Sequence, residues 1–95
     1  ALISHAKSMA MELAPKGIRV NCVAPGSIDF PGGFWENVHQ NQPAFYDMVV
    51  STIPFGRMGR PEEVANAVVF LASGKASWVS GVTLAVDGVQ HKGNL

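Results

Sequence analysis

The segment that decides the fold is a run of strand-forming residues that leads into a turn, Ile18-Arg19-Val20-Asn21-Cys22-Val23-Ala24-Pro25-Gly26-Ser27-Ile28. The run from 18 to 23 predicts a short buried strand, and Pro25-Gly26 ends it because proline has no ladder N–H and glycine adopts angles closed to other residues. Ligands of α/β sheets bind where such strands end. We therefore expect function at this turn, although an ordinary strand-ending turn also accounts for the pair taken alone.

Composition limits the kinds of partner. The chain has 95 residues, of which 47% are hydrophobic, and its 7 basic and 7 acidic residues leave no net charge. This composition predicts part or all of one domain. Because Lys and Arg form no cluster, we expect neither nucleic acid nor an anionic membrane surface as a partner, and the neutral balance favours a small molecule or a protein.

The reactive side chains predict no metal or disulfide chemistry. Cys22 is the single cysteine and lies in an apolar run, so we expect a buried, unreactive thiol and a reducing, cytoplasmic setting. His5, His39 and His91 show no ligand spacing, so no metal site is expected. The longest apolar run, 64–71, is far shorter than the roughly 20 residues that span a bilayer, and no secretion signal opens the chain, so no membrane segment is expected.

The opening segment predicts a helix. Apolar residues recur at helical spacing over 2–13, and Pro15 and Gly17 end the pattern just before the strand. Neither a capping residue nor an initiator Met precedes Ala1, so we expect this helix to have been cut from a longer chain.

The segment over 30–60 is the least regular part of the chain. We interpret it as two short helices joined by Asn41-Gln42, the second of which opens at Pro43. An insertion between a strand and the next full helix of an α/β enzyme is typically its lid.

The last third predicts a helix followed by a second strand. Pro61 and the acidic residues after it provide a preset first turn for a helix over 61–72, and the apolar run over 82–86 predicts a strand that Asp87-Gly88 ends. Short apolar strands separated by helices are typical of parallel strands covered on two faces, so we expect an α/β fold with a right-handed crossover.

Five blocks of residues in this order match one family. They are Ile18-Arg19-Val20-Asn21 with Ala24-Pro25-Gly26, Gly56-Arg57-Met58-Gly59-Arg60-Pro61-Glu62-Glu63-Val64-Ala65, Phe70-Leu71-Ala72-Ser73, Ser80-Gly81 and Val86-Asp87-Gly88. With them the chain resembles the C-terminal part of a classical short-chain dehydrogenase/reductase. The resemblance implies the C-terminal portion of a doubly wound, Rossmann-type parallel-sheet domain, with two parallel strands, three or more helices, and residues 1–95 as a fragment of one dinucleotide-binding oxidoreductase domain.

The resemblance also implies that the catalytic residues lie elsewhere. The family's phosphate-binding glycine loop, catalytic Ser and Tyr-x-x-x-Lys pair all fall upstream of Ala1. Tyr46 does not supply that pair because Val50 stands where the Lys is needed, so we expect it to be a lid or core aromatic residue. Asn21 is expected to make structural hydrogen bonds, and no catalytic residue is expected within the chain.

By the same resemblance, Pro25, Gly26, Ser27 and Ile28 are expected to bind NAD or NADP. The main chain at Ser27 and Ile28 is expected to contact the carboxamide of the nicotinamide ring, which offers one donor and one acceptor face. Many relatives have Thr where this chain has Phe30, so no hydroxyl contact is expected from that position.

Aromatic residues after the turn predict the wall of a substrate lid. Phe30, Phe34 and Trp35 are the candidates, with Gly32 and Gly33 as hinges, and their packing against neighbouring helices is the alternative. In relatives the long helix and the final strand also serve assembly into tetramers, so a homo-oligomer is expected.

Two functions stay open at this point. The first is part of an oxidoreductase that transfers hydride between a nicotinamide cofactor and an alcohol or ketone. The second is a catalytically inactive fragment that serves only as an oligomerisation or interaction module. Because the Tyr-x-x-x-Lys pair is missing, the isolated chain is expected to be inactive. Because its sheet has an open edge and its helices lack strands to cover, it is expected to be unfolded, aggregated or folded only with another copy or the missing half.

Overall fold

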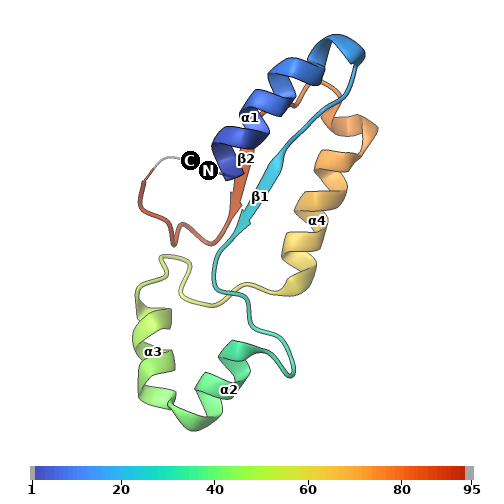
Figure 1. Ribbon diagram of the computed structural model, residues 1–95. Helices are drawn as coiled ribbons and strands as arrows, with labels where there is room; N and C mark the ends of the chain where they lie inside the picture. The colour runs from blue at the N-terminus through green and yellow to red at the C-terminus, as the bar shows by residue number, and fades with distance from the viewer. Residues whose placement is uncertain (1, 94–95) are drawn as a thin grey trace.

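A computed structural model of the chain describes residues 2–93 (Figure 1). The predicted start at Ala1 lies outside the described residues. The elements in order are α1 (Leu2–Leu13), the 3-10 turn η1 (Ala14–Lys16), β1 (Cys22–Pro25), α2 (Phe34–Asn41), α3 (Pro43–Ser51), α4 (Pro61–Ala72), the 3-10 turn η2 (Gly74–Ala76) and β2 (Thr83–Val86).

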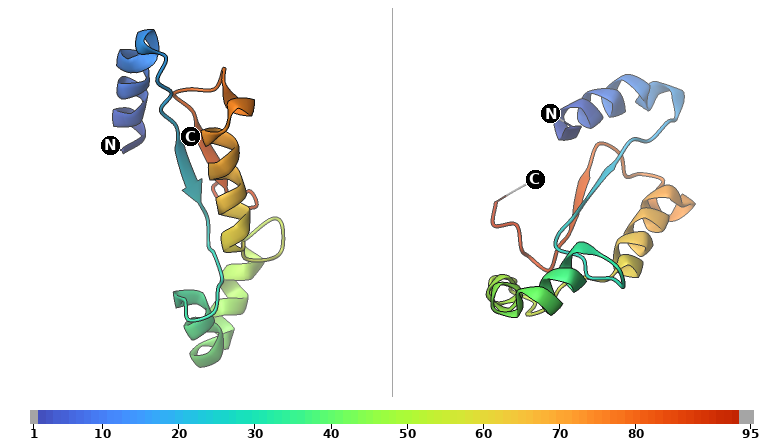
Figure 2. Two further views of the ribbon diagram at one scale, coloured as in Figure 1. Left: turned by 90° about the vertical axis from the view of Figure 1, so that its right-hand side faces the viewer. Right: turned by 60° about the horizontal axis from the view of Figure 1, so that its bottom comes forward.

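The sheet consists of β1 and β2, which pair in parallel with Cys22 opposite Thr83 and Pro25 opposite Val86. Figure 2 shows α1 on one side of the strands and α4 on the other. A helix on each face of a parallel pair is the doubly wound arrangement. The predicted fold class is therefore confirmed.

The first strand begins later than predicted. It covers Cys22–Pro25, whereas the sequence indicated a strand over 18–23 that Pro25 ended. Residues 18–21 are tied down by separate bonds instead of a ladder: the Val20 N–H donates to Ser80 Oγ at 3.1 Å, and the Val20 carbonyl accepts from the Gly81 N–H at 2.7 Å.

Pro25 belongs to β1 because its missing N–H faces away from β2. The N–H of Cys22 donates to the Val82 carbonyl at 2.9 Å, and that of Gly26 donates to the Val86 carbonyl at 3.0 Å. Main-chain N–H groups of a strand alternate between its two sides. Pro25 therefore removes no bond to β2, as is usual for proline at the edge of a sheet.

Arg19 closes the C-terminal end of α4. Its guanidinium donates to three main-chain carbonyls, those of Leu71 (2.6 Å), Val79 (3.2 Å) and Ser73 (3.2 Å). Carbonyls at the end of a helix lack partners within it, and a cation is favoured there. Asn21 adds a bridge, donating to the Val79 carbonyl and accepting from the Val82 N–H, both at 3.1 Å, so its predicted structural role is confirmed.

The helices α2 and α3 form a hairpin beyond the carboxyl ends of the strands (Figure 1). Gln42 alone separates them, and Pro43 occupies the first turn of α3. Proline suits this position because the first N–H groups of a helix have no intrahelical partner. The two predicted short helices are confirmed.

The chain leaves much apolar surface uncovered. Its radius of gyration is 16.0 Å and its accessible surface is 6526 Å², whereas a compact protein of this size has values of about 12 Å and about 5,300 Å². Large apolar residues are exposed on several elements, among them Met11 on α1 (72%), Val69 on α4 (66%) and Trp78 between η2 and β2 (99%). These helices and strands therefore present surfaces of the kind that normally pack against further parts of a domain.

Cys22 is partly exposed, so the prediction of a buried thiol was wrong. The reason is that β1 has a neighbouring strand on one side only within the described residues. None of the helices over residues 2–93 is long and apolar enough to cross a membrane.

Candidate functional site

The turn after β1 lies against the turn after β2, at the carboxyl ends of both strands. Besides its bond to Val86, Gly26 sits so close to Asp87 that a Cβ on Gly26 would lie 2.7 Å from the Asp87 Cβ and 2.9 Å from its Cα. Because real Cβ atoms do not approach that closely, this position requires glycine. The predicted pair Pro25-Gly26 thus stands where ligands of parallel sheets bind.

Ile28 makes an isolated parallel bridge with Gly59. The bonds of this bridge flank Ile28: the Gly59 N–H donates to the Ser27 carbonyl and the Asp29 N–H donates to the Gly59 carbonyl, both at 2.9 Å. In a parallel bridge, the groups of the central residue point the other way. The Ile28 N–H and carbonyl therefore face away from Gly59, and within residues 2–93 neither has a hydrogen-bond partner.

Ser27 has its polar groups occupied. Its N–H donates to Gln90 Oε1 and its Oγ accepts from Gln90 Nε2, each at 2.9 Å. Its carbonyl accepts from Gly59. The structure therefore separates two residues that the sequence treated alike, since Ile28 offers its main chain and Ser27 does not. The role of Gln90 was missed, because a glutamine near the end of a chain matches no motif.

Hollows flank this turn on both sides. One has a volume of about 320 Å³ and is lined in part by Ser27, Ile28 and Arg57. The other has a volume of about 350 Å³ and is lined in part by Pro25 and Gln90. The four predicted cofactor residues are thus brought together at one accessible edge of the sheet.

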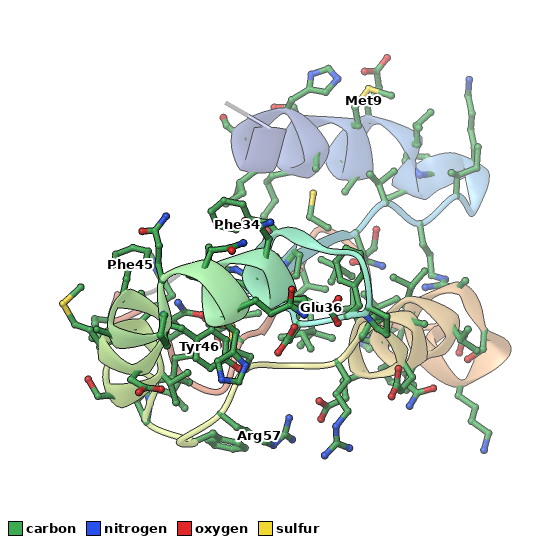
Figure 3. The ribbon with its side chains drawn as sticks, turned by 90° about the horizontal axis from the view of Figure 1, so that it is seen from below. Met9, Phe34, Glu36, Phe45, Tyr46 and Arg57 are labelled. Carbon is green, nitrogen blue, oxygen red and sulfur yellow. The ribbon has the colours of Figure 1, made fainter. Side chains whose placement is uncertain are left out.

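The predicted lid residues lie on the hairpin and on the loop before it. Phe34 meets Trp35 edge to face with ring centroids 5.0 Å apart, and Trp35 stacks on Phe45 at 6.2 Å. Figure 3 shows Phe34 on α2 and Phe45 on α3. Phe30 does not belong to this cluster. Its ring lies against Gly33, so close that a Cβ on Gly33 would be 2.7 Å from the ring.

Tyr46 connects the hairpin to the turn. Its hydroxyl donates to Asp29 Oδ2 at 3.1 Å, and its ring stacks on His39 with centroids 4.0 Å apart. Partial burial raises the pKa of the Tyr46 phenol, and the hydrogen bond to Asp29 and the charges of Asp29 and Asp47 raise it further. A phenol that donates protons in catalysis needs the opposite shift, so Tyr46 is suited to a structural link.

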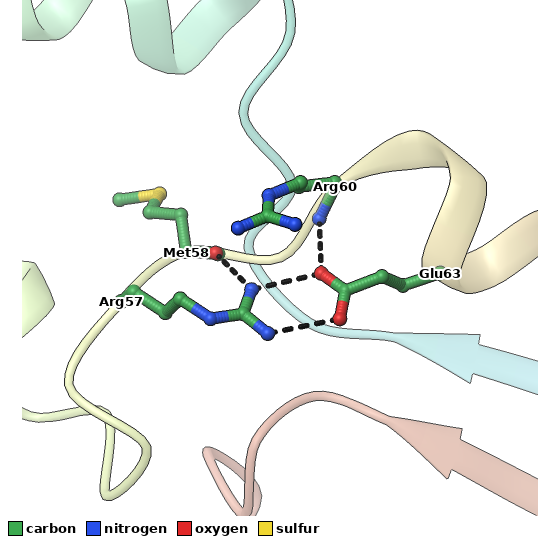
Figure 4. A network of polar contacts seen from close by, with 4 residues as sticks. All are labelled: Arg57, Met58, Arg60 and Glu63. Atoms are coloured by element: carbon green, nitrogen blue, oxygen red, sulfur yellow. Dashed lines mark hydrogen bonds and ion pairs between the residues drawn. The ribbon is translucent and has the colours of Figure 1, made fainter.

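An ion pair fixes the loop that carries Gly59 (Figure 4). Arg57 donates from Nη1 and Nη2 to the two carboxylate oxygens of Glu63 at 2.8 and 2.9 Å, and the Arg60 N–H donates to Glu63 Oε1 at 3.0 Å. These bonds, the one from Arg57 first, lower the pKa of Glu63 from 4.5 to about 2. The same pairing raises the pKa of Arg57.

No cluster of three or more His, Cys, Asp or Glu side chains able to hold a metal ion occurs in the described part of the chain. His5 lies on α1, Cys22 on β1, His39 on α2 and His91 in the segment after β2. What the site offers is main-chain donors and acceptors at the end of a parallel sheet.

Comparison with known proteins decides the family. The family model described as enoyl-(acyl carrier protein) reductase matches residues 1–89. The chain belongs to the short-chain dehydrogenase/reductase family. The sequence resemblance to the C-terminal part of such a protein is thus confirmed.

Relatives of this short-chain dehydrogenase/reductase chain are longer than it is. The chain is 49% identical over 87 residues to the 3-oxoacyl-(acyl-carrier-protein) reductase FabG of Buchnera aphidicola, covering 92% of itself and 34% of that protein. It spans about a third of the length of the curated relatives it matches.

Solved structures agree over the same portion. The NADPH-dependent reductase YwfH, involved in bacilysin biosynthesis, matches 98% of this chain with 37% of its own, at a TM-score of 0.85 and 37% identity. An oxidoreductase of the short-chain dehydrogenase/reductase family from Burkholderia thailandensis matches 98% of this chain with 35% of its own, also at a TM-score of 0.85, with 38% identity.

The blocks that carried the resemblance contact one another in this short-chain dehydrogenase/reductase fold. Each contact joins a residue of the first block to a later one. The pairs are Arg19 with Leu71 and Ser73, Val20 with Ser80 and Gly81, and Gly26 with Asp87. The matching residues thus hold the two strand ends and α4 in a fixed relation.

Proposed function

We propose that this chain is the C-terminal third of an NAD- or NADP-dependent oxidoreductase that transfers hydride between its cofactor and an alcohol or ketone. The observation that carries the proposal is the orientation of Ile28, whose N–H and carbonyl face away from Gly59 at the carboxyl ends of the strands. Membership of an oxidoreductase family supports it.

The groups at this turn fit the carboxamide of a nicotinamide ring. A carboxamide presents one acceptor and one donor, and Ile28 offers one N–H and one carbonyl on the same side of the chain. Pro25 and Gly26 lead the main chain to this point without a bulky side chain. When bound, the nicotinamide ring supplies the hydride chemistry, and the role of these residues is to orient it.

The accompanying proton is assigned to groups outside residues 1–95. Tyr46 has Val50 in place of the needed Lys, and its hydrogen bond to Asp29 and its raised pKa hold its proton in place. Binding and orientation are therefore the proposed tasks of this portion, and proton transfer is not.

Residues 30–60 are proposed as the substrate lid. Phe34 is 67% exposed and Phe30 is 45% exposed, so packing within the described residues leaves part of each residue accessible to a substrate. Exposed aromatic side chains beside a binding site support contact with an apolar part of the substrate. Trp35 is proposed to back Phe34 from within the cluster.

The second candidate is an inactive fragment that acts only as an interaction module. The observations that favour it are the missing Tyr-x-x-x-Lys pair and the exposed apolar face of α4, where Val68 is 48% and Val69 66% exposed. In the parent enzyme, the same face is proposed to join copies into a homotetramer. A cytoplasmic location is proposed for both candidates.

The test is turnover by the full-length protein that contains this chain. The intact mass of the protein isolated from its natural source establishes the length of the chain. The full-length protein is then assayed with a panel of secondary and cyclic alcohols, with NAD and with NADP, by the absorbance of the reduced cofactor. We expect reduction of one cofactor by the full-length protein and none by residues 1–95 alone. Turnover by the 95-residue chain unaided contradicts the proposal, and a full-length protein that reduces neither cofactor supports the interaction module.

A further inference from the structure

We propose that Gln90 is a positioning residue for the nicotinamide carboxamide, acting through Ser27 on the main chain of Ile28. This inference rests on the proposed function, because it concerns the direction of the two Ile28 groups assigned to the cofactor. Gln90 itself is not proposed to touch the cofactor.

The side-chain amide of Gln90 makes two hydrogen bonds to Ser27. Its Oε1 accepts from the Ser27 N–H and its Nε2 donates to Ser27 Oγ, both at 2.9 Å. Two bonds from one planar group fix both the position and the rotation of the residue they reach, which a single bond does not. Ser27 is thus locked from the side of the turn that follows β2.

Gln90 is in turn held by Asp87. The carboxylate of Asp87 accepts from the N–H groups of Val89 and His91, each at 3.0 Å, and the Gln90 N–H donates to the Asp87 carbonyl at 3.0 Å. The backbone of Gly88 and Val89 has positive φ angles of 57° and 68°. Residues 87–91 therefore form a tight turn with a defined place for the Gln90 side chain.

Ser27 is locked on its other side as well. Its carbonyl accepts from the Gly59 N–H at 2.9 Å, and Asp29 donates back to Gly59 at the same distance. Ile28 stands between these anchored neighbours. Releasing Gln90 removes one of the two restraints on the N-terminal side of Ile28 and leaves only the bond between the Ser27 carbonyl and Gly59, so the direction of the Ile28 N–H becomes less defined.

Gln90→Met in the full-length protein separates this role from general stability. Methionine keeps the length of the side chain and removes both hydrogen bonds. Dissociation constants are measured by calorimetry for the preferred dinucleotide and for the matching ADP-ribose, which lacks the nicotinamide. We expect dinucleotide binding to weaken about tenfold and ADP-ribose binding to change less than about twofold.

Two further measurements accompany the affinities. Without cofactor, the Ser27 amide is expected to exchange its hydrogen at least about tenfold faster in the variant, because its acceptor is gone. The double variant Ser27→Ala with Gln90→Met is expected to lose less dinucleotide affinity than the sum of the losses in the two single variants, since both substitutions remove the same hydrogen bond. Asn66→Ala, which removes an exposed amide from α4, is the control and is expected to match the wild type.

Each outcome decides between these roles. Equal weakening for the dinucleotide and ADP-ribose shows that Gln90 supports the site as a whole and overturns the proposal, as does unchanged binding of both. A wild-type protein that binds ADP-ribose as tightly as the dinucleotide overturns the assignment of Ile28 to the carboxamide, and with it this inference. That failure is recognised in the wild type alone, before any variant is compared.

Discussion

Arg57 and Glu63 stand on either side of Gly59 in the sequence, and the ion pair between them closes the loop that pairs with Ile28. The pair is partly exposed, with 45% of the Arg57 and 35% of the Glu63 side chain accessible. The pair mainly orients the loop, since a two-point guanidinium–carboxylate contact restrains direction as well as distance. The ion pair therefore restrains the loop that carries Gly59 where it bridges to Ile28.

The pH dependence of stability is expected to report on this pair. The pKa of Glu63 is lowered from 4.5 to about 2 in the folded chain. A lowered pKa means that the stabilisation is complete above the unfolded value and is lost as pH falls toward the folded one. Glu63→Gln is therefore expected to be less stable than wild type near pH 7, with the difference shrinking between pH 4.5 and 2.

Urea unfolding of the full-length protein at a series of pH values measures this. Glu62→Gln removes an exposed neighbouring carboxylate with no hydrogen bond among the described residues and is the control. A constant difference between wild type and Glu63→Gln across the series speaks against the pairing.

Arg19→Lys is expected to destabilise the full-length protein by about 2 kcal/mol, because a lysine keeps the charge but does not reach three separate carbonyls. The measurement is the urea unfolding free energy. Lys16→Arg, at an exposed position before the strand, is the matched control for a change between the two cations. A loss below about 0.5 kcal/mol is incompatible with this capping role.

Gly26→Ala is expected to lower the free energy of unfolding by at least about 2 kcal/mol, since the added methyl group would overlap the Cα and Cβ of Asp87. Gly74→Ala is the control, because nothing lies within 4 Å of a Cβ there and its backbone angles suit alanine. Thermal unfolding of both variants gives the comparison. Similar midpoints for the two variants contradict the close approach of the strand ends.

Val89→Gly is expected to stabilise the protein by about 1 kcal/mol. Val89 has a φ of 68°, a left-handed conformation that is unfavourable for a β-branched residue and free of steric cost for glycine. Val86→Gly, in the regular part of β2, is expected to have the opposite effect. Unfolding free energies of the three proteins test the sign, and a destabilising Val89→Gly contradicts the conformation.

Phe34→Ala is expected to change substrate preference more than stability. Because Phe34 is 67% exposed, the substitution is expected to lower the free energy of unfolding by less than about 1 kcal/mol, while kcat/KM ratios among a set of alcohols shift by about fivefold or more. Met11→Ala, also on an exposed helix face, is the control and leaves those ratios unchanged. Equal ratios in Phe34→Ala and wild type remove Phe34 from the lid.

The helices and the second strand were predictable here, and the limits of the first strand were not. Pro43 and Pro61 marked the starts of α3 and α4 because proline fits the first turn of a helix and little else inside one. The start of β1 was misplaced because Arg19 and Asn21 lie in an apolar run yet use their side chains for carbonyls elsewhere. Such long-range side-chain bonds leave no periodic trace in a sequence.

The site shows the same division. Pro25-Gly26 was found because turn chemistry is local, and the structure places it at the predicted strand ends. The partners of that turn were not found, since Gln90 reaches Ser27 across 63 positions in the chain. Asp29 was likewise missed as the acceptor for Tyr46. Contacts of this kind depend on the fold being known first.

Pro25 limits the hydrogen bonding of the edge of β1 that faces away from β2. Between Cys22 and the turn, only Val23 has an N–H pointing to that edge, because the next position of the same parity is proline. A further strand laid along this edge would run out of donors after Val23. The next main-chain N–H without a partner within residues 2–93 is that of Ile28, which lies past the end of β1 and is the group proposed to meet the carboxamide.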